Sequence, residues 1–372
     1  MLRLAVLAAI ALVLVAPALA SAPSVGGRAY YVENAANGDV LLTRAARERV
    51  PIASITKLMT VLVTLEHAKL GDVVTVTRQA AATGESTIDL QVGEQITVGE
   101  LVEAALIQSA NDAAVALAGY VGGGSQKAFV ALMNRKAHEL GLRDTHFANP
   151  DGLDAAGHYS SARDVTRLAE IAMHNPVIRD VVRQTQAFIS GGRILHTWND
   201  LLSTFPHLLG VKTGHTSAAG WSEVAAARGR GVTIYATLLG EPTRSQRNAD
   251  LAALLAYGLS RYRVVPVISS QRVYASARAP YGRRALNLVA PRTLVRVVRV
   301  DRTLREQVVT PAVVSLPVVR GQRLGEVRVY AGRKLLASEP LVATRSIAKP
   351  GLLGRTGFYA RRTADHLWSW LS

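Results

Sequence analysis

Apolar residues recur along the first two thirds of the chain at spacings that predict a hairpin, several helices and a strand meander. Residues 29–44 are typical of a β-hairpin, because apolar runs flank the turn-forming pair Asn37-Gly38. Apolar positions at helical spacing predict helices starting at Ser54 and ending near Gly71, and over 98–107, 113–120, 129–140 and 164–174. The pattern then predicts strands over 208–213, 221–227 and 232–239 and a helix over 247–259. This succession favours an α+β fold in which helices cover an antiparallel sheet.

The pattern changes after Tyr262, and this change divides the chain. Residues 21–263 are expected to form the α+β domain. Residues 264–346 are rich in Val and Arg, with short apolar runs broken by turns, and are expected to form a small all-β domain.

A tail, residues 347–372, follows the break at Pro350-Gly351. Its apolar residues recur at helical spacing with Trp368 beside them, at Leu353, Ala360, Ala364, Leu367 and Leu371. Because cations such as Arg361 fall on the opposite side, the tail predicts an amphipathic helix suited to a membrane interface. The alternatives are a helix docked on the β-domain and a frayed chain end.

The first twenty residues are typical of a secretory signal peptide. Arg3 precedes an apolar run, and Ala18-Leu19-Ala20 fits a cleavage site for export. The alternative is an uncleaved membrane anchor, but the 17 residues from Leu4 to Ala20 fall short of the roughly 20 that span a bilayer. The protein is therefore expected outside the cytoplasm.

Composition narrows the classes of function. The chain of 372 residues, 49% of them hydrophobic, is long enough for two packed domains. It contains no cysteine, which excludes a thiolate nucleophile and a thiolate metal site. The net charge of +16 would suit nucleic acid, but the basic residues are scattered and aromatics make up only 5%. An anionic membrane or cell wall is the simpler partner.

Ser54 and Lys57 form the first candidate catalytic pair, within Ser54-Ile55-Thr56-Lys57. A serine hydroxyl needs a base before it attacks a carbonyl, and residues three apart share one face of a helix. Lys57 can serve as that base if its pKa falls, for which burial and a neighbouring cation such as Lys212 are the candidate causes. The alternative is that Ser54 merely caps a helix and Lys57 lies at the surface.

Ser109-Ala110-Asn111 lies between two predicted helices, so its polar side chains can face a cleft. Ser109 is a candidate proton relay to a leaving amine. Asn111 is a candidate to hold both Lys57 and a substrate amide carbonyl. The alternative is that one of the two residues caps the following helix.

Lys212-Thr213-Gly214 lies on a predicted strand, whose exposed edge can bind an extended peptide through main-chain hydrogen bonds. Gly214 permits close approach of another backbone, while Lys212 supplies positive charge and Thr213 a hydroxyl for a carboxylate. The amides of Ser54 and His215 are candidates for an oxyanion hole. The alternative is an ordinary strand end.

Each of the three strings is weak alone, but together, in this order and on fitting elements, they predict acyl transfer through a covalent serine ester. With them the chain resembles the low-molecular-mass penicillin-binding proteins that act as D-alanyl-D-alanine carboxypeptidases. The resemblance extends over about residues 25–372, β-domain and tail included, and is carried by residues 51–60, 109–114, 149–153, 158–164 and 210–216.

The resemblance implies a penicillin-binding or β-lactamase-like catalytic domain in which Ser54 is the acyl-ester nucleophile and Lys57 the proton acceptor. Ser109 and Asn111 would complete the proton relay and amide binding. Substrate contacts would fall to Lys212, Thr213, Gly214, His215 and Arg247.

Arg247 is expected near the terminal carboxylate of the substrate, although Arg244 competes for that role. His158 and Asp164 are expected to be structural. The implied substrate is a peptidoglycan pentapeptide ending in D-Ala-D-Ala, and β-lactams are the expected covalent inhibitors. No metal, other cofactor or nucleic acid is expected.

Rival functions remain open at this stage. A class A β-lactamase uses a glutamate for deacylation, but between Asn111 and Lys212 the only glutamates are Glu139 and Glu170, neither of them within residues 149–164. A D,D-endopeptidase that cuts wall cross-links is a second rival, and a catalytically silent wall-binding protein is a third.

Overall fold

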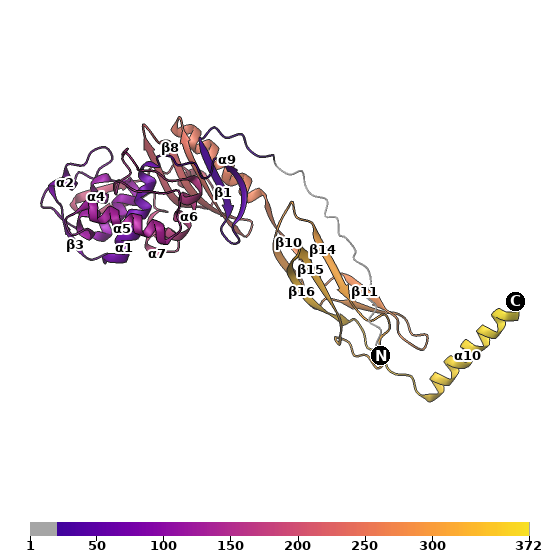
Figure 1. Cartoon of the computed structure of the whole chain (residues 1–372). Helices are drawn as coiled ribbons and strands as arrows, with labels where there is room; N and C mark the ends of the chain where they lie inside the picture. The colour runs from indigo at the N-terminus through magenta and orange to yellow at the C-terminus, as the bar shows by residue number, and fades with distance from the viewer. Residues whose placement is uncertain (1–20, 372) are drawn as a thin grey trace. The chain divides into compact units, whose positions relative to one another are not determined.

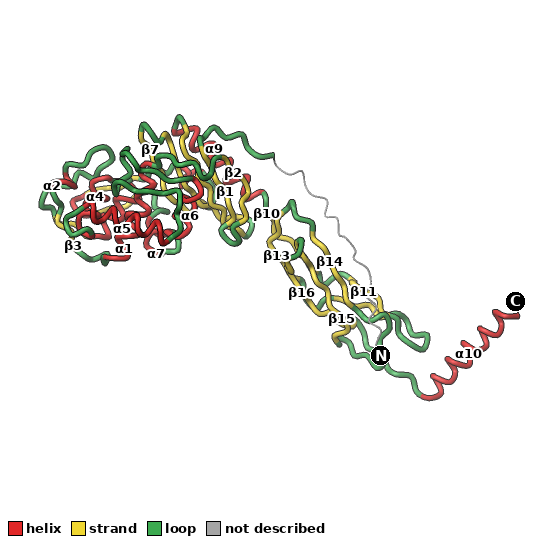
Figure 2. Tube along the Cα trace, viewed as in Figure 1, coloured by secondary structure: helices red, strands yellow, loops and turns green. Residues whose placement is uncertain are grey.

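A computed structural model describes residues 21–371 of the chain. The backbone divides into two compact units, the first ending at Arg261 and the second beginning at Tyr262. Helices gather in the first unit, whereas strands make up most of the second (Figure 2). The predicted signal peptide, residues 1–20, lies outside the described residues.

The first unit contains a five-stranded antiparallel sheet (Figure 1). Its spatial order is β2-β1-β9-β8-β7. The strands are β1 (Ala29–Asn34), β2 (Asp39–Arg44), β7 (Leu208–Thr216), β8 (Gly220–Gly229) and β9 (Val232–Glu241). The predicted hairpin of residues 29–44 is confirmed, since Gly38 takes the positive φ of 66° that its turn requires. The Lys212-Thr213-Gly214 motif therefore lies on the edge strand β7.

Helices cover both faces of this sheet. Gly258 of α9 packs against Ile234, whereas Thr166 of α6 contacts Thr237. Positions 234 and 237 of β9 point to opposite faces, because side chains alternate along a strand. The helices are α1 (Lys57–His67), α2 (Arg78–Ala81), α3 (Val98–Glu103), α4 (Asn111–Val121), α5 (Gln126–Glu139), α6 (Ala162–Ala172), α7 (Pro176–Val181), α8 (Leu201–Thr204) and α9 (Arg244–Ser260).

Short elements complete the first unit. Two small hairpins are formed by β3 (Val73–Thr75) with β4 (Gln95–Thr97) and by β5 (Gln186–Ile189) with β6 (Arg193–His196). Short helical turns occur at η1 (Ala53–Thr56), η2 (Ala104–Gln108) and η3 (Ser190–Gly192), and η2 is a π-helical turn.

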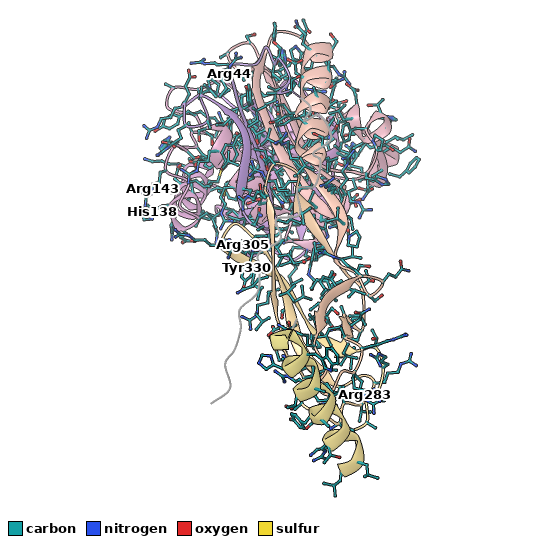
Figure 3. All side chains as sticks on the ribbon, turned by 90° about the vertical axis from the view of Figure 1, so that its right-hand side faces the viewer. Arg44, His138, Arg143, Arg283, Arg305 and Tyr330 are labelled. Carbon is teal, nitrogen blue, oxygen red and sulfur yellow. The ribbon has the colours of Figure 1, made fainter. Side chains whose placement is uncertain are left out.

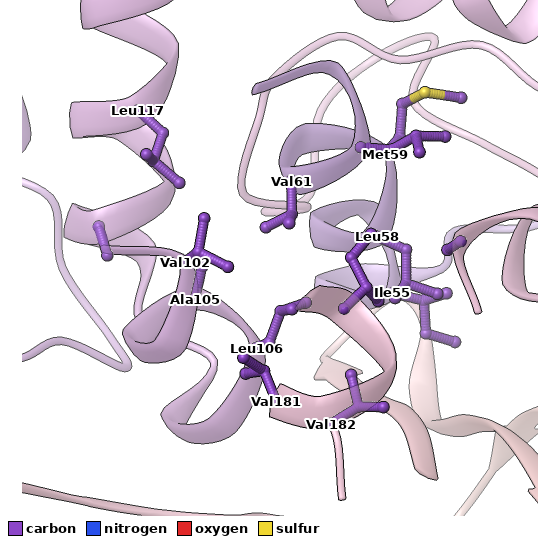
Figure 4. Packing of buried hydrophobic residues seen from close by; sticks show 14 of the residues in the cluster. Ile55, Leu58, Met59, Val61, Val102, Ala105, Leu106, Leu117, Val181 and Val182 are labelled. Atoms are coloured by element: carbon purple, nitrogen blue, oxygen red, sulfur yellow. The ribbon is translucent and has the colours of Figure 1, made fainter. Parts of the chain in front are cut away.

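The hydrophobic core of this unit is centred on α1, which packs against α4, α5 and α6. Leu58 and Val61 of α1 are fully buried, and Leu106 and Val181 lie close by (Figure 4). The buried helix holds its first residue, Lys57, in a fixed place.

The structure corrects several predicted helix limits. The helix expected to end near Gly71 ends at His67, because Ala68 takes an extended backbone conformation. The helix expected from Ser54 begins instead at Lys57, and Ser54 lies in the preceding 3-10 turn η1, because Ala53 takes a left-handed φ of 47°. The helix expected over 98–107 gives way to the π-helical turn η2 after Glu103. The helix expected over 247–259 starts earlier, at Arg244, because the Thr243 hydroxyl accepts the Gln246 amide as an N-cap.

The second unit consists mainly of β-strands, in two antiparallel sheets. One pairs β10 with β13, and the other has the order β11-β12-β16-β15-β14. Its core includes Leu288, Val327 and Leu341, which are fully buried. The strands are β10 (Tyr262–Ile268), β11 (Val273–Ala277), β12 (Leu286–Val289), β13 (Leu294–Arg299), β14 (Leu304–Val309), β15 (Arg323–Ala331) and β16 (Lys334–Ala343).

The predicted tail helix is confirmed as α10 (Leu352–Leu371). Several of its apolar side chains are exposed, with Leu353 at 90% and Trp368 at 75%. Tyr281, in a loop of the β-unit, contacts Phe358 of α10 edge to face, and Arg283, labelled in Figure 3, follows in the same loop. Among residues 21–371, no helix has both the length and the apolarity needed to cross a membrane.

The buried position of Leu58 predicts a large cost for its truncation. Leu58→Ala should lower the free energy of unfolding of the first unit by about 2–5 kcal/mol, because it leaves a cavity in a packed core. Denaturant unfolding measures this change. The matched control Leu70→Ala removes a side chain that is 42% exposed and should change stability by less than about 0.5 kcal/mol. Equal effects of the two substitutions would contradict the described core.

Candidate active site

Ser54 and Lys57 lie within hydrogen-bonding distance of each other. Ser54 is in the η1 turn and Lys57 is the first residue of α1, so one turn of helical backbone brings them together. The Lys57 Nζ lies 2.8 Å from the Ser54 Oγ. Lys57 is fully buried, whereas Ser54 remains partly exposed. The structure thus places a solvent-accessible hydroxyl against a buried amine.

Three oxygen atoms surround the Lys57 amine. Besides Ser54, it donates to the Asn111 Oδ1 at 2.7 Å and to the Asp151 carbonyl at 2.7 Å. Burial lowers the pKa of Lys57 to about 8, although the negative charges of Asp151 and Glu85 oppose that shift. The amine therefore loses its proton far more easily than a lysine in water.

Ser109 is held in a strained conformation beside a second lysine. It follows the π-helical turn η2 and has a left-handed φ of 64°, and such turns are frequent at functional sites. Its Oγ accepts a hydrogen bond of 2.8 Å from the Lys212 Nζ. Burial, and then the charge of Lys57, lowers the pKa of Lys212 well below its usual value.

This result changes one expectation about the two lysines. Lys212 was the candidate cation for lowering the pKa of Lys57, but burial, the other expected cause, accounts for the lowered pKa of Lys57. The reason is that Lys212 is itself almost fully buried, at 2% exposure, so it also loses its charge readily.

Strand β7 lies directly against η1, the turn that contains Ser54. A Cβ added at Gly214 would lie 2.8 Å from the Ile52 carbonyl oxygen and 3.1 Å from the Ser54 nitrogen. Only glycine permits this approach. His215, the next residue, is exposed and stacks on Trp221, with ring centroids 4.1 Å apart.

Most of the predicted site residues line one cavity of about 180 Å³. Lys57 and Lys212 lie behind its wall, bonded to Ser54 and Ser109. Its lining consists of Ser54, Glu85, Ser86, Ser109, Asn111, Trp198, Thr213, Gly214, His215, Trp221 and Arg247.

Arg247 lines the cavity while held in a network of charges. Its Nε lies 3.1 Å from a carboxylate oxygen of Glu223, and its guanidinium also contacts Asn248 and Asp200. Arg247 is only 1% exposed. Arg244 instead pairs with Asp200 at 2.8 Å and does not line the cavity. Of the two arginines, Arg247 is the one that the structure places at the cavity.

His158 and Asp164 contact the framework around the site. The Nε2 of His158 lies 2.7 Å from the Thr56 Oγ1, and its Nδ1 accepts the Ala148 amide. Burial lowers the pKa of His158 to about 4, so the ring is neutral. Asp164 accepts hydrogen bonds from the Asp144 amide and the Thr145 hydroxyl.

Sequence reasoning missed several groups at the site. The Asp151 carbonyl contacts Lys57 because Gly152, at a φ of 91°, packs so closely that an added Cβ would lie 2.0 Å from the Ala53 carbonyl oxygen. The string Asn149-Pro150-Asp151-Gly152 predicts a turn, but it does not predict this contact. Glu223 could have been found as a single acid before the apolar run 224–227. No local sequence pattern indicated that the site would include Glu85, Trp198 and Trp221.

The two glutamates considered for a β-lactamase lie elsewhere. Glu139 pairs with Lys136, and Glu170 lies beside Glu33 and Arg167. Neither lines the cavity, where Glu85 is the one carboxylate among the described lining residues.

Comparisons with known proteins show to which family the chain belongs. The sequence model of the D-alanyl-D-alanine carboxypeptidase family, peptidase family S11, matches residues 17–243. DacC of Escherichia coli, a D-alanyl-D-alanine carboxypeptidase, is 32% identical over 374 residues, covering 94% of this chain and 92% of the relative. DacF of Bacillus subtilis, which has the same activity in its name, is 31% identical over 329 residues, covering 85% of this chain and 84% of the relative.

A solved structure extends the likeness to the fold. The crystal structure of the D-alanyl-D-alanine carboxypeptidase DacD from Francisella tularensis has a TM-score of 0.64 and 25% sequence identity, and covers 89% of this chain and 95% of that chain. This similarity confirms the predicted α+β domain followed by a β-domain. Because the matched region contains all three motifs and the relatives align over most of the chain, the chain belongs to the D-alanyl-D-alanine carboxypeptidase family.

Proposed function

We propose that this protein removes the terminal D-alanine of peptidoglycan pentapeptides, with Ser54 as the nucleophile and Lys57 as its base. This assignment of roles rests on the 2.8 Å contact between the Lys57 Nζ and the Ser54 Oγ. With a pKa of about 8, about one Lys57 amine in ten is neutral at pH 7, against about one in three thousand at the ordinary value. Burial thus supplies the base that a serine nucleophile needs.

Acylation moves one proton away from Ser54. The Ser54 Oγ attacks the carbonyl carbon between the two D-alanines and gives its proton to neutral Lys57. The amides of Ser54 and His215 stabilise the oxyanion. The carbon–nitrogen bond then breaks as the leaving amine takes a proton from Ser109, and the Lys212 ammonium replaces that proton through its 2.8 Å hydrogen bond and becomes neutral.

Deacylation restores the resting protonation states. Water attacks the acyl carbonyl carbon, and its proton passes to the Ser109–Lys212 pair. The bond from that carbon to the Ser54 Oγ breaks, and Lys57 returns its proton to Ser54. The products are a tetrapeptide with a new carboxyl group and free D-alanine.

Strand β7 and Arg247 support binding of the substrate. β7 is an edge strand, which can bind an extended peptide by main-chain hydrogen bonds. Thr213, His215 and Arg247 line the same cavity, so the hydroxyl, ring and guanidinium are available to the terminal carboxylate. β-Lactams that mimic the D-Ala-D-Ala end should acylate Ser54.

A D,D-endopeptidase activity on cross-linked peptides is the second candidate. The same cavity serves both reactions, so the substrate decides between them. Release of D-alanine from a pentapeptide, compared with cleavage of a cross-linked dimer, separates the two. A silent wall-binding protein would do neither.

Export and membrane association complete the proposal. Residues 1–20 have the pattern of a signal peptide, and α10 exposes apolar and cationic side chains together. An interfacial helix with these properties binds anionic lipid surfaces. The enzyme would then act at the outer face of the cytoplasmic membrane.

Replacement of Ser54 by alanine should abolish both reactions assigned to it. Ser54→Ala should reduce D-alanine release from a pentapeptide more than about 10³-fold, and should remove the covalent benzylpenicillin adduct seen by mass spectrometry. Far-UV circular dichroism serves as the folding control. A penicillin adduct on the alanine variant would show that another residue is the nucleophile.

The pKa of Lys57 predicts the pH dependence of catalysis. Because its pKa is lowered and the neutral amine is the active form, the rising limb of kcat/KM against pH should have its midpoint near pH 8. Lys57→Arg should eliminate activity at every pH tested, since a guanidinium remains charged. A rise centred near pH 10.5 would contradict the assignment of Lys57 as a buried base.

The tail predicts a separable membrane function. Deletion of residues 350–372 should abolish co-sedimentation with vesicles containing anionic phospholipid and leave D-alanine release from a soluble peptide unchanged. Vesicles of neutral lipid alone are the control for charge. Full co-sedimentation of the truncated protein would assign membrane binding to another part of the chain.

A further inference from the structure

Glu85 is the one carboxylate among the described residues that line the catalytic cavity. Its side chain is exposed, and within residues 21–371 it takes part in no ion pair. The proposed mechanism gives it no task. An acid that is both accessible and directed to a substrate cavity is available to bind a cation.

The backbone on either side of Glu85 is hydrogen-bonded to Asn111, which is part of the proposed catalytic machinery. Asn111 donates from its Nδ2 to the Gly84 carbonyl at 3.0 Å and from its main-chain nitrogen to the Ser86 carbonyl at 2.7 Å. Ser86 also bonds to the Gln108 carbonyl through its hydroxyl. Both neighbours of Glu85 are therefore anchored beside the Asn111 that contacts Lys57.

Glu85 occupies a backbone conformation that does not favour it. Its φ is 64°, in the left-handed region that glycine and asparagine adopt most readily. A side chain kept at such a position carries a conformational cost, and such costs gather at functional sites. The strain gives a second, independent reason to look for a role of the carboxylate.

The cationic and the acidic side chains that line the cavity come from different elements of the fold. Arg247 comes from α9, and Thr213 and His215 come from the sheet, where the terminal carboxylate is proposed to bind. Glu85 comes from the loop between α2 and β4, beside Ser109 and Asn111. A ligand that matches this arrangement carries an anion at its leaving end and a cation on its acyl portion.

We propose that Glu85 is a specificity-determining residue that binds a free ammonium group on the acyl side of the scissile amide. The preferred substrate is a peptide ending in D-Ala-D-Ala whose preceding residue has an amine on its side chain. This inference rests on the proposed carboxypeptidase function.

Two peptides test this inference with the full-length protein. They are Nα-acetyl-L-Lys-D-Ala-D-Ala, with a free ε-amine, and the Nα,Nε-diacetyl form, in which that amine is neutral. The unmodified protein should show kcat/KM about 10-fold higher for the free amine. Glu85→Gln should abolish this preference by lowering kcat/KM for the amine substrate relative to that for the diacetyl peptide at the same pH. Glu139→Gln, a matched change of an acid outside the cavity, should leave the preference intact.

The pH profile separates this role from an electrostatic effect on the base. The charge of Glu85 raises the pKa of Lys57, so Glu85→Gln should move the rising limb of kcat/KM to lower pH for both peptides alike. Recognition of the ammonium group, in contrast, changes only one peptide. A second variant, Glu85→Gly, should lose the preference and raise the melting temperature, because glycine relieves the left-handed backbone.

The outcomes distinguish the inference from the function on which it rests. Equal kcat/KM for the two peptides in the unmodified protein, or an equal loss for both in Glu85→Gln, would overturn the ammonium site while leaving the carboxypeptidase intact. Failure to release D-alanine from either peptide would overturn the proposed function and the ammonium site together.

Discussion

The burial of the Lys57 amine is the constraint on which the site depends. A charged amine in a packed core is costly unless it is hydrogen-bonded, and here three oxygen atoms contact it, one of them the Ser54 hydroxyl. The same burial lowers its pKa. The core around α1 therefore sets both the position of this amine and its protonation. Packing and the acid–base chemistry of Lys57 are not separate properties of this helix.

Much of the fold and site could be predicted from local patterns. The hairpin, the three later strands and the helical segments follow from apolar periodicity and turn residues, which act over a few positions. Ser54, Ser109 and Thr213 were identified because serine chemistry requires particular groups at particular spacings, and the structure brings them to one cavity. The predicted family was confirmed by comparison with known proteins.

Other features depend on long-range contacts that no short window contains. The Asp151 carbonyl is a main-chain group, so the residue type gives no signal for its contact with Lys57. The start of α1 shifted because Ala53 adopts a left-handed φ of 47° beside β7, and Gly214 leaves room for that approach. The contact of Arg247 with Glu223 joins α9 to β8. Each of these results from tertiary packing rather than from propensity.

Asn111 connects the Lys57 amine with the backbone on either side of Glu85. Its side-chain oxygen accepts from Lys57, while its two nitrogens hold the carbonyls on either side of Glu85. A displacement of the loop that contains Glu85 would therefore shift the same amide group that contacts the lysine. A sequence change in this loop would reach the buried amine through one hydrogen-bonded residue, without altering any residue of the core.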